Sequence, residues 1–133
     1  MKKIEHIGIA VKDIKKAEKI FSTIFNHCSD KTEEVIAEAV KTTFFKVGES
    51  KIELVSATNT DSPIAKYLKK NQEGVHHISF AVENIIKEME RLKNEGFQLL
   101  NDTPKEGADN KLICFLHPKD TAGVLIELCQ EKE

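Results

Sequence analysis

Apolar positions along the chain follow two different periods, and these periods occur twice in the same order. An alternating apolar and polar run at 4–11 precedes a segment at 14–25 whose apolar residues have helical spacing. A similar alternating run at 75–82 precedes another helical pattern at 85–92. Further alternating runs follow each helical segment. We therefore predict two copies of one unit, in which a strand is followed by a helix and then by more strands.

Turn chemistry predicts where these elements begin and end. Asp13 and Asn84 are good helix N-caps, Ser62-Pro63 is typical of the start of a third, short helix, and Gly96 suits a helix end. The expected strands lie at 4–11, 40–47, 51–55, 75–82, 97–100, 112–116 and 124–129, with one more between 30 and 39. The segment 105–111 is expected to be a loop. The order predicts an α+β fold of two tandem βαβββ modules, at about 1–71 and 72–133, within one domain.

Composition and charge narrow the class of partner. The chain has 133 residues and a net charge of −2, with lysine and arginine scattered among the acidic residues, which argues against nucleic acid or a membrane as the main partner. No apolar run reaches transmembrane length, so we expect a cytoplasmic protein. Cys28, Cys114 and Cys129 have no short spacing. They are expected to be reduced structural thiols, without a disulfide or a cysteine-based zinc site.

Each repeat carries one histidine and one glutamate at matching positions. His6 and His77 lie in the strands at 4–11 and 75–82, and Glu53 and Glu127 lie in the strands at 51–55 and 124–129. Each histidine shares its strand face with small residues, which leaves room for a ligand. A glutamate in an apolar strand is costly to bury unless a partner compensates its charge. Two imidazoles and two carboxylates are a plausible ligand set for one catalytic divalent metal.

Each of these residues also has an ordinary structural interpretation. A single histidine in a strand is more often hydrogen-bonded than metal-ligating, and a single glutamate on a sheet usually faces solvent. The four matching positions together favour the metal site. His76 lies on the opposite strand face and is expected to be structural, His27 to be at the surface, and His117 to be a turn residue or to line a pocket mouth. A solvated helix face is favoured over a phosphate site for three lysines: Lys66, Lys69 and Lys70.

These residues resemble the vicinal oxygen chelate superfamily and, within it, the methylmalonyl-CoA epimerase family. The similarity covers nearly the whole chain. The segments most typical of the epimerases are Ser62-Pro63-Ile64-Ala65-Lys66, Gly74-Val75-His76-His77-Ile78, Lys105-Glu106-Gly107-Ala108 and Phe115-Leu116-His117-Pro118-Lys119. The resemblance implies a cup-shaped mixed sheet around a metal site, as in glyoxalase and bleomycin-resistance proteins.

The resemblance also implies a ligand set and a reaction. The metal ligands would be His6, Glu53, His77 and Glu127, and Glu127 would also be catalytic; some relatives have glutamine in place of Glu53. One divalent ion is implied, with cobalt favoured over manganese, nickel, zinc or magnesium. The family interconverts the two epimers of methylmalonyl-CoA by removing the α proton, through an enolate that the metal stabilises. The implied partners are a small acyl-CoA substrate and a second copy in a homodimer.

The chain departs from the family at one position. Some relatives use a second glutamate as an acid or base, and this chain aligns Thr42 there, so Glu38 or a bound water is an alternative proton carrier. Two other functions remain as alternatives. The first is a lactoylglutathione lyase of the glyoxalase I type, which acts on a hemithioacetal with similar ligands. The second is a metal-free binding module, which the presence of all four ligand positions disfavours.

Overall fold

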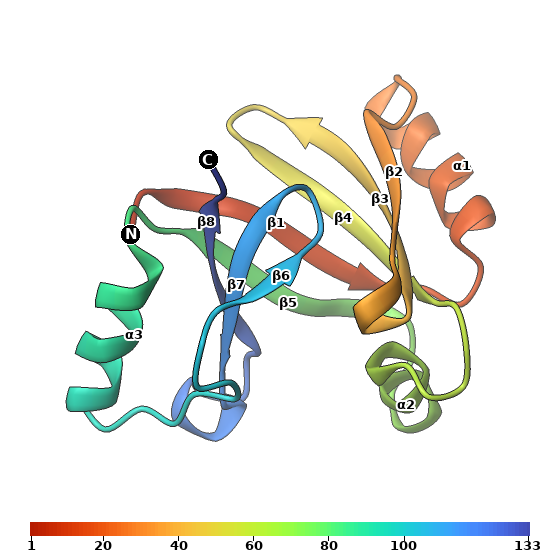
Figure 1. The fold of residues 1–133 in the computed structure, drawn as a ribbon. Helices are drawn as coiled ribbons and strands as arrows, with labels where there is room; N and C mark the ends of the chain where they lie inside the picture. Colours follow the sequence, from red (N-terminus) through yellow and green to blue (C-terminus); the bar gives the residue numbers. More distant parts are fainter. The chain divides into compact units, whose positions relative to one another are not determined.

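The computed structural model describes residues 1–133, and the strand, helix, strands order occurs twice in it (Figure 1). The elements of the first repeat are β1 (Lys3–Ala10), α1 (Ile14–Phe25), β2 (Lys31–Val35), β3 (Val40–Val47), β4 (Ser50–Ala57) and α2 (Pro63–Lys70). Those of the second are β5 (Gly74–Ala81), α3 (Ile85–Asn94), β6 (Lys105–Gly107), β7 (Lys111–Leu116) and β8 (Ile126–Glu131). Two short 3-10 turns cover Ile36–Glu38 and Pro118–Asp120. No helix is long and apolar enough to cross a membrane.

The chain forms two compact units. One is continuous and runs from Ile7 to His76. The other joins Met1–His6, with the beginning of β1, to His77–Glu133. The first six residues are therefore part of the unit that contains the second repeat, although they are far from it in sequence.

In the unit 7–76, β2, β3 and β4 pair in antiparallel fashion. The end of β1 lies beside β4, where Val11 N donates to Val55 O at 2.9 Å. Val11 and Leu54 pack with α1 on one side of these strands. Ala10 and Val55 pack with α2 on the other side. Side chains alternate along extended chain, so the neighbours Ala10 and Val11 contact different helices, and so do Leu54 and Val55.

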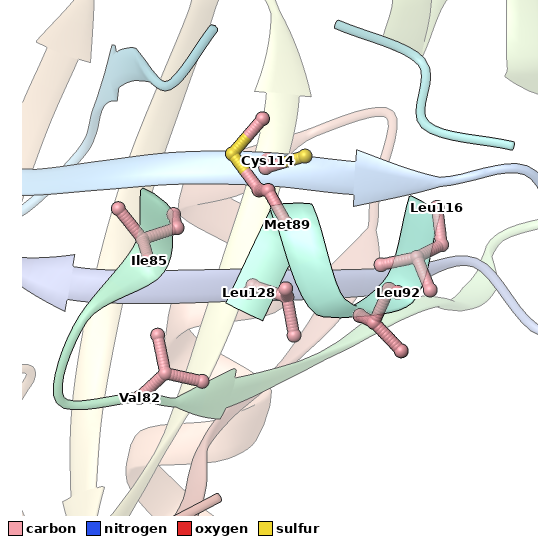
Figure 2. Packing of buried hydrophobic residues seen from close by; sticks show 7 residues of the cluster. All are labelled: Val82, Ile85, Met89, Leu92, Cys114, Leu116 and Leu128. Atoms are coloured by element: carbon pink, nitrogen blue, oxygen red, sulfur yellow. The ribbon is translucent and has the colours of Figure 1, made fainter. Parts of the chain in front are cut away.

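In the other unit the strand order is β1, β5, β8, β7, β6. Strands β5 and β8 are parallel, and β8, β7 and β6 are antiparallel neighbours, so the sheet is mixed. Helix α3 covers one face of this sheet. Figure 2 shows its contact with β7 and β8, a buried cluster of Val82, Ile85, Met89, Leu92, Cys114, Leu116 and Leu128. Leu128 is fully buried, which contributes roughly 1.5–3 kcal/mol. Glu127 and Cys129 alternate with Leu128 and so belong to the face away from α3.

The three predicted helix starts are confirmed. Asp13 Oδ1 accepts a hydrogen bond from Lys16 N at 3.1 Å, and Asn84 Oδ1 accepts one from Lys87 N at 3.0 Å. Ser62 Oγ accepts from Ile64 N at 3.2 Å, with Pro63 as the first helical residue. The same type of cap therefore begins the long helix of each repeat.

Two local predictions are wrong. The predicted strand at 97–100 is a single bridge between Leu99 and Leu116. The segment at 97–100 does not extend its pairing with β7, because Phe115 N donates to the side-chain Oδ1 of Asn101, at 3.1 Å, and not to a backbone carbonyl. The apolar residues that suggested a strand, Phe97 and Leu99, pack against the α3 cluster instead. Within the predicted loop at 105–111, Lys105–Gly107 forms the short edge strand β6.

Candidate metal centre

Three of the four predicted metal ligands meet in one unit: His6, His77 and Glu127. The two Nε2 atoms of His6 and His77 are 3.1 Å apart. Glu127 Oε2 lies 3.4 Å from His6 Nε2, and Glu127 Oε1 lies 3.9 Å from His77 Nε2. One ligand atom from each residue lies within 4.8 Å of those of the other two, and all three residues are buried.

The sheet register explains this convergence. In the parallel pair β5 and β8, Ser79 is opposite Glu127, so Glu127 lies on the same face as His77. Met1–His6 joins the same unit, with Lys2 N donating to Ala81 O at 2.8 Å. The two imidazole rings are nearly perpendicular, with centroids 5.2 Å apart. This arrangement directs nitrogen and oxygen donors from three strands to one point.

The donor set fits a divalent cation. Glu127 Oε2 is buried and has no hydrogen-bond partner, although it lies close to His6 Nε2. A buried carboxylate oxygen without a partner is costly, and a bound cation would remove this cost. Imidazole nitrogen and carboxylate oxygen suit first-row divalent metals. The residues present therefore fit the ion that the sequence pattern predicts.

The fourth predicted ligand, Glu53, lies in the other unit. It is a buried residue of β4, opposite Phe44 of β3. Its assignment as a metal ligand stays a prediction that rests on the repeat. Thr42 of β3, the residue aligned with the second glutamate of some relatives, is also buried, and its Oγ1 donates to Glu33 O at 3.3 Å.

Sequence reasoning missed one residue of the site, Glu5. Glu5 Oε1 lies 3.1 Å from His6 Nδ1, and both residues are buried. The signal was present in the sequence, because Glu5 directly precedes His6 in an otherwise apolar strand. An ionised carboxylate can only accept hydrogen bonds, so the ring nitrogen is the donor in this contact.

The aromatic wall of the site is Phe115 of β7. Its ring is perpendicular to that of His77, with centroids 6.0 Å apart. Phe115 is the antiparallel partner of Glu127, and Lys105 Nζ lies 5.6 Å from the centroid of its ring. The Phe115 ring is therefore an apolar surface beside His77, and the ammonium group of Lys105 lies near the same ring.

The remaining candidates have structural or surface roles. His76 contacts the Tyr67 ring edge-on, with centroids 4.7 Å apart. His117 Nδ1 accepts from Lys119 N at 3.1 Å and so stabilises a turn. His27 is exposed and bonds to Cys28 O at 2.7 Å. The three lysines of α2 are exposed, as the solvated-face interpretation requires: Lys66, Lys69 and Lys70.

The cysteines are free thiols, and two of them, Cys114 of β7 and Cys129 of β8, are buried. Burial raises the pKa of the Cys129 thiol to about 12 and that of Cys114 to about 11. Glu127 and Glu5 further raise the pKa of Cys129, and Ser79 lowers it. Both thiols are therefore protonated at neutral pH, when a thiolate would be needed to bind a metal.

Comparison with known proteins identifies the family. The Glyoxalase/Bleomycin resistance protein/Dioxygenase superfamily model matches residues 5–115. The chain belongs to this superfamily. The human mitochondrial methylmalonyl-CoA epimerase is 37% identical over 129 residues, which are 96% of this chain and 73% of the human protein.

Two solved structures have the same fold. A Streptomyces coelicolor methylmalonyl-CoA epimerase variant, in complex with 2-nitronate-propionyl-CoA, has a TM-score of 0.95 and 32% identity, covering 100% of this chain and 99% of that one. A methylmalonyl-CoA epimerase in complex with methylmalonyl-CoA and NH4+ has a TM-score of 0.94 and 33% identity, covering 98% and 95%. The predicted glyoxalase-like α+β fold and the predicted resemblance to the epimerases are confirmed.

Proposed function

We propose that this chain interconverts the (R) and (S) epimers of methylmalonyl-CoA by removing and returning the α proton, with a divalent metal bound at His6, His77 and Glu127. The observation that carries this proposal is the convergence of these three buried side chains in a chain that epimerases match from end to end. Glu53 is proposed as the fourth ligand, from its position in the repeat.

Relatives support the isomerase class and the substrate. The curated relatives from animals carry the name methylmalonyl-CoA epimerase at 35–37% identity. One structural neighbour holds methylmalonyl-CoA itself. The predicted isomerase activity is therefore supported over the lactoylglutathione lyase alternative, which no relative described above favours.

The chain's own residues would divide the chemistry between binding and proton transfer. A divalent cation held by His6, His77 and Glu127 would supply positive charge beside the substrate's oxygens. His6 and His77 are neutral donors that hold it without cancelling its charge. Glu127 is the carboxylate best placed to carry a proton, since it belongs to the ligand cluster.

Inversion needs a second proton carrier on the other face of the α carbon. Thr42 is a poor proton carrier, because a neutral hydroxyl is both a weak acid and a weak base, and Thr42 Oγ1 already donates its hydrogen to Glu33 O. We propose that a water molecule or Glu38 takes this role. Glu38 ends the 3-10 turn Ile36–Glu38, immediately before β3.

Several finer assignments are proposed with this function. The metal is proposed to be cobalt, with manganese, nickel, zinc and magnesium as alternatives, since imidazole and carboxylate ligands accept all of them. The acyl-CoA is proposed as the small-molecule partner. A cytoplasmic homodimer is proposed, with each site built from a single chain.

The direct test is proton NMR of methylmalonyl-CoA in deuterated water with metal-loaded protein. We expect the α-proton signal to disappear, and a chelator-treated sample to leave it intact. Loss of the signal at equal rates in both samples would contradict metal-dependent proton abstraction. No exchange, with metal demonstrably bound, would contradict the substrate assignment and favour the lyase, which can be tested with a hemithioacetal.

Substitution of the proposed proton carrier separates chemistry from folding. Glu127→Gln keeps the shape of the side chain but removes its charge, so proton exchange should fall by at least about 100-fold while the protein stays folded. His77→Ala should have the same effect through loss of the metal. The matched control is Glu131→Gln, four residues further along β8 and largely exposed, which should retain exchange. Near-normal exchange in Glu127→Gln would contradict the proposed role of Glu127.

A further inference from the structure

We propose that Glu5 is a positioning residue that sets the tautomer of His6 and so determines which of its nitrogens binds the metal. This inference rests on the proposed function for the identity of the metal site. It goes beyond that function because it assigns a role to a residue outside the ligand set. The observation is the 3.1 Å contact between Glu5 Oε1 and His6 Nδ1.

The direction of the hydrogen bond follows from the chemistry of the two groups. A carboxylate has no hydrogen to donate, so Nδ1 of His6 carries it. A neutral imidazole has one N–H, which leaves Nε2 of His6 with a bare lone pair. This lone pair is on the nitrogen that lies 3.1 Å from His77 Nε2 and 3.4 Å from Glu127 Oε2. The contact with Glu5 therefore presents the correct nitrogen to the ligand cluster.

The same contact distinguishes the two histidines. Two Nε2 atoms at 3.1 Å make a hydrogen bond only if one of them carries a hydrogen. Because Glu5 keeps the hydrogen of His6 on Nδ1, His77 is the donor in that bond. His6 is therefore prepared for a metal, whereas His77 must move its hydrogen to Nδ1 before its Nε2 can bind one.

Glu5 also lines a polar cavity. The cavity has a volume of about 260 Å³, and its lining includes Glu5, Lys2, Lys3 and Lys111. Lys111 is itself a buried residue of β7. Glu83, Glu131 and Glu133 line the same cavity, and Lys111 Nζ lies 3.4 Å from Glu131 Oε1, so the wall carries charges of both signs. This cavity also supplies the competing explanation, in which Glu5 serves only as a partner of these lysines.

The test combines a tautomer measurement with a metal titration. In the metal-free protein labelled with 15N-histidine, long-range proton–nitrogen NMR should show His6 as the Nδ1–H tautomer, with its signals assigned by their loss in His6→Gln. In Glu5→Ala this preference should be lost, and the Kd for Co²⁺ should rise about 10- to 100-fold, as for other partners of metal-bound histidines. Glu5→Gln retains an acceptor oxygen, so it should weaken Co²⁺ binding less than Glu5→Ala does. It also keeps the inference testable if the alanine variant does not fold.

The matched control is Glu83→Gln, which removes a carboxylate from the wall of the same cavity. It should keep the wild-type His6 tautomer and Co²⁺ affinity. Glu5→Ala with an unchanged tautomer and affinity would overturn the inference. If the wild-type protein binds no Co²⁺ or Mn²⁺, the proposed function fails, and the tautomer comparison in metal-free protein still decides the role of Glu5.

Discussion

At the scale of single residues, two adjacent histidines have different surroundings. His77 of β5 faces His6 and Glu127, and His76 contacts the Tyr67 ring of α2. Strand alternation alone produces this difference, because consecutive side chains point to opposite faces. The pair therefore offers a comparison between a proposed ligand and a packing residue at neighbouring positions.

We expect His76→Ala to lower stability without affecting catalysis. Loss of the edge-on contact with Tyr67 should cost about 0.5–1.5 kcal/mol, while proton exchange from methylmalonyl-CoA stays within about two-fold of wild type because no ligand is disturbed. Urea unfolding and the NMR exchange assay measure the two effects. A large loss of exchange with normal stability would mean that the strand faces are assigned backwards.

The buried thiol of Cys129 predicts a loss of stability at alkaline pH. Its pKa is about 12 in the folded protein, against an ordinary value of 9.0. Above pH 9 the unfolded chain releases this proton and the folded chain keeps it, so the free energy of unfolding should fall by about 1.4 kcal/mol per pH unit from this group. Below about pH 8 its contribution is constant.

Urea unfolding under reducing conditions at pH 8, 9 and 10 tests this prediction. The difference in stability between wild type and Cys129→Ala should change by less than about 0.5 kcal/mol from pH 8 to 9 and should shift against wild type by about 1 kcal/mol from pH 9 to 10. Parallel pH profiles for the two proteins would contradict it.

At the scale of elements, the two long helices begin in the same way although they lie in different units. Asp13 caps α1 and Asn84 caps α3, each by accepting from the backbone N–H three residues later. Local turn chemistry is therefore one of the features that the repeat preserves. Helix packing differs between the copies, since α3 packs on the cluster around Leu128 and α1 on the cluster around Leu54.

Removal of either cap should destabilise its own helix by a similar amount. Asp13→Ala and Asn84→Ala should each lower the free energy of unfolding by about 1 kcal/mol, because one backbone N–H loses its partner. Hydrogen exchange should show the loss of protection in the first turn of the affected helix only. Asp13→Asn and Asn84→Asp are the controls. Each keeps a side-chain oxygen that can accept the hydrogen bond, so each should retain most of the wild-type stability.

At the scale of the whole molecule, the proposed metal ligands come from distant parts of the chain. His6 lies in β1, His77 in β5 and Glu127 in β8, so an ion bound by them would cross-link these three strands within one unit. A ligand that binds only the folded state stabilises it in proportion to the logarithm of its concentration above the Kd. Metal binding is therefore expected to be coupled to folding stability.

Loading with Co²⁺ at about 100 times its Kd should add about 2.7 kcal/mol to the free energy of unfolding, seen as a rise in Tm. A chelator should reverse the rise. His77→Ala provides the control, since it removes one ligand and should abolish most of the effect. An equal rise in Tm for His77→Ala would place the bound metal elsewhere in the protein.

The sequence by itself determined the local features and the types of ligand. Periodicity and capping residues act over a few neighbours, so the helix starts at Asp13, Ser62 and Asn84 and the strand Val40–Val47 could be predicted without any knowledge of packing. The repeat made His6, His77 and Glu127 candidates, and the structure places their side chains in one cluster.

Only the tertiary structure decided how distant segments meet. Met1–His6 joins the unit of the second repeat. The contact of Glu5 with His6 bears on the candidate site because Nε2 of the same ring faces His77. The strand predicted at 97–100 failed for a similar reason, because the side chain of Asn101 takes the hydrogen bond of Phe115 that a longer ladder would use. Pairing between strands depends on partners that are remote in sequence, and no local pattern encodes them.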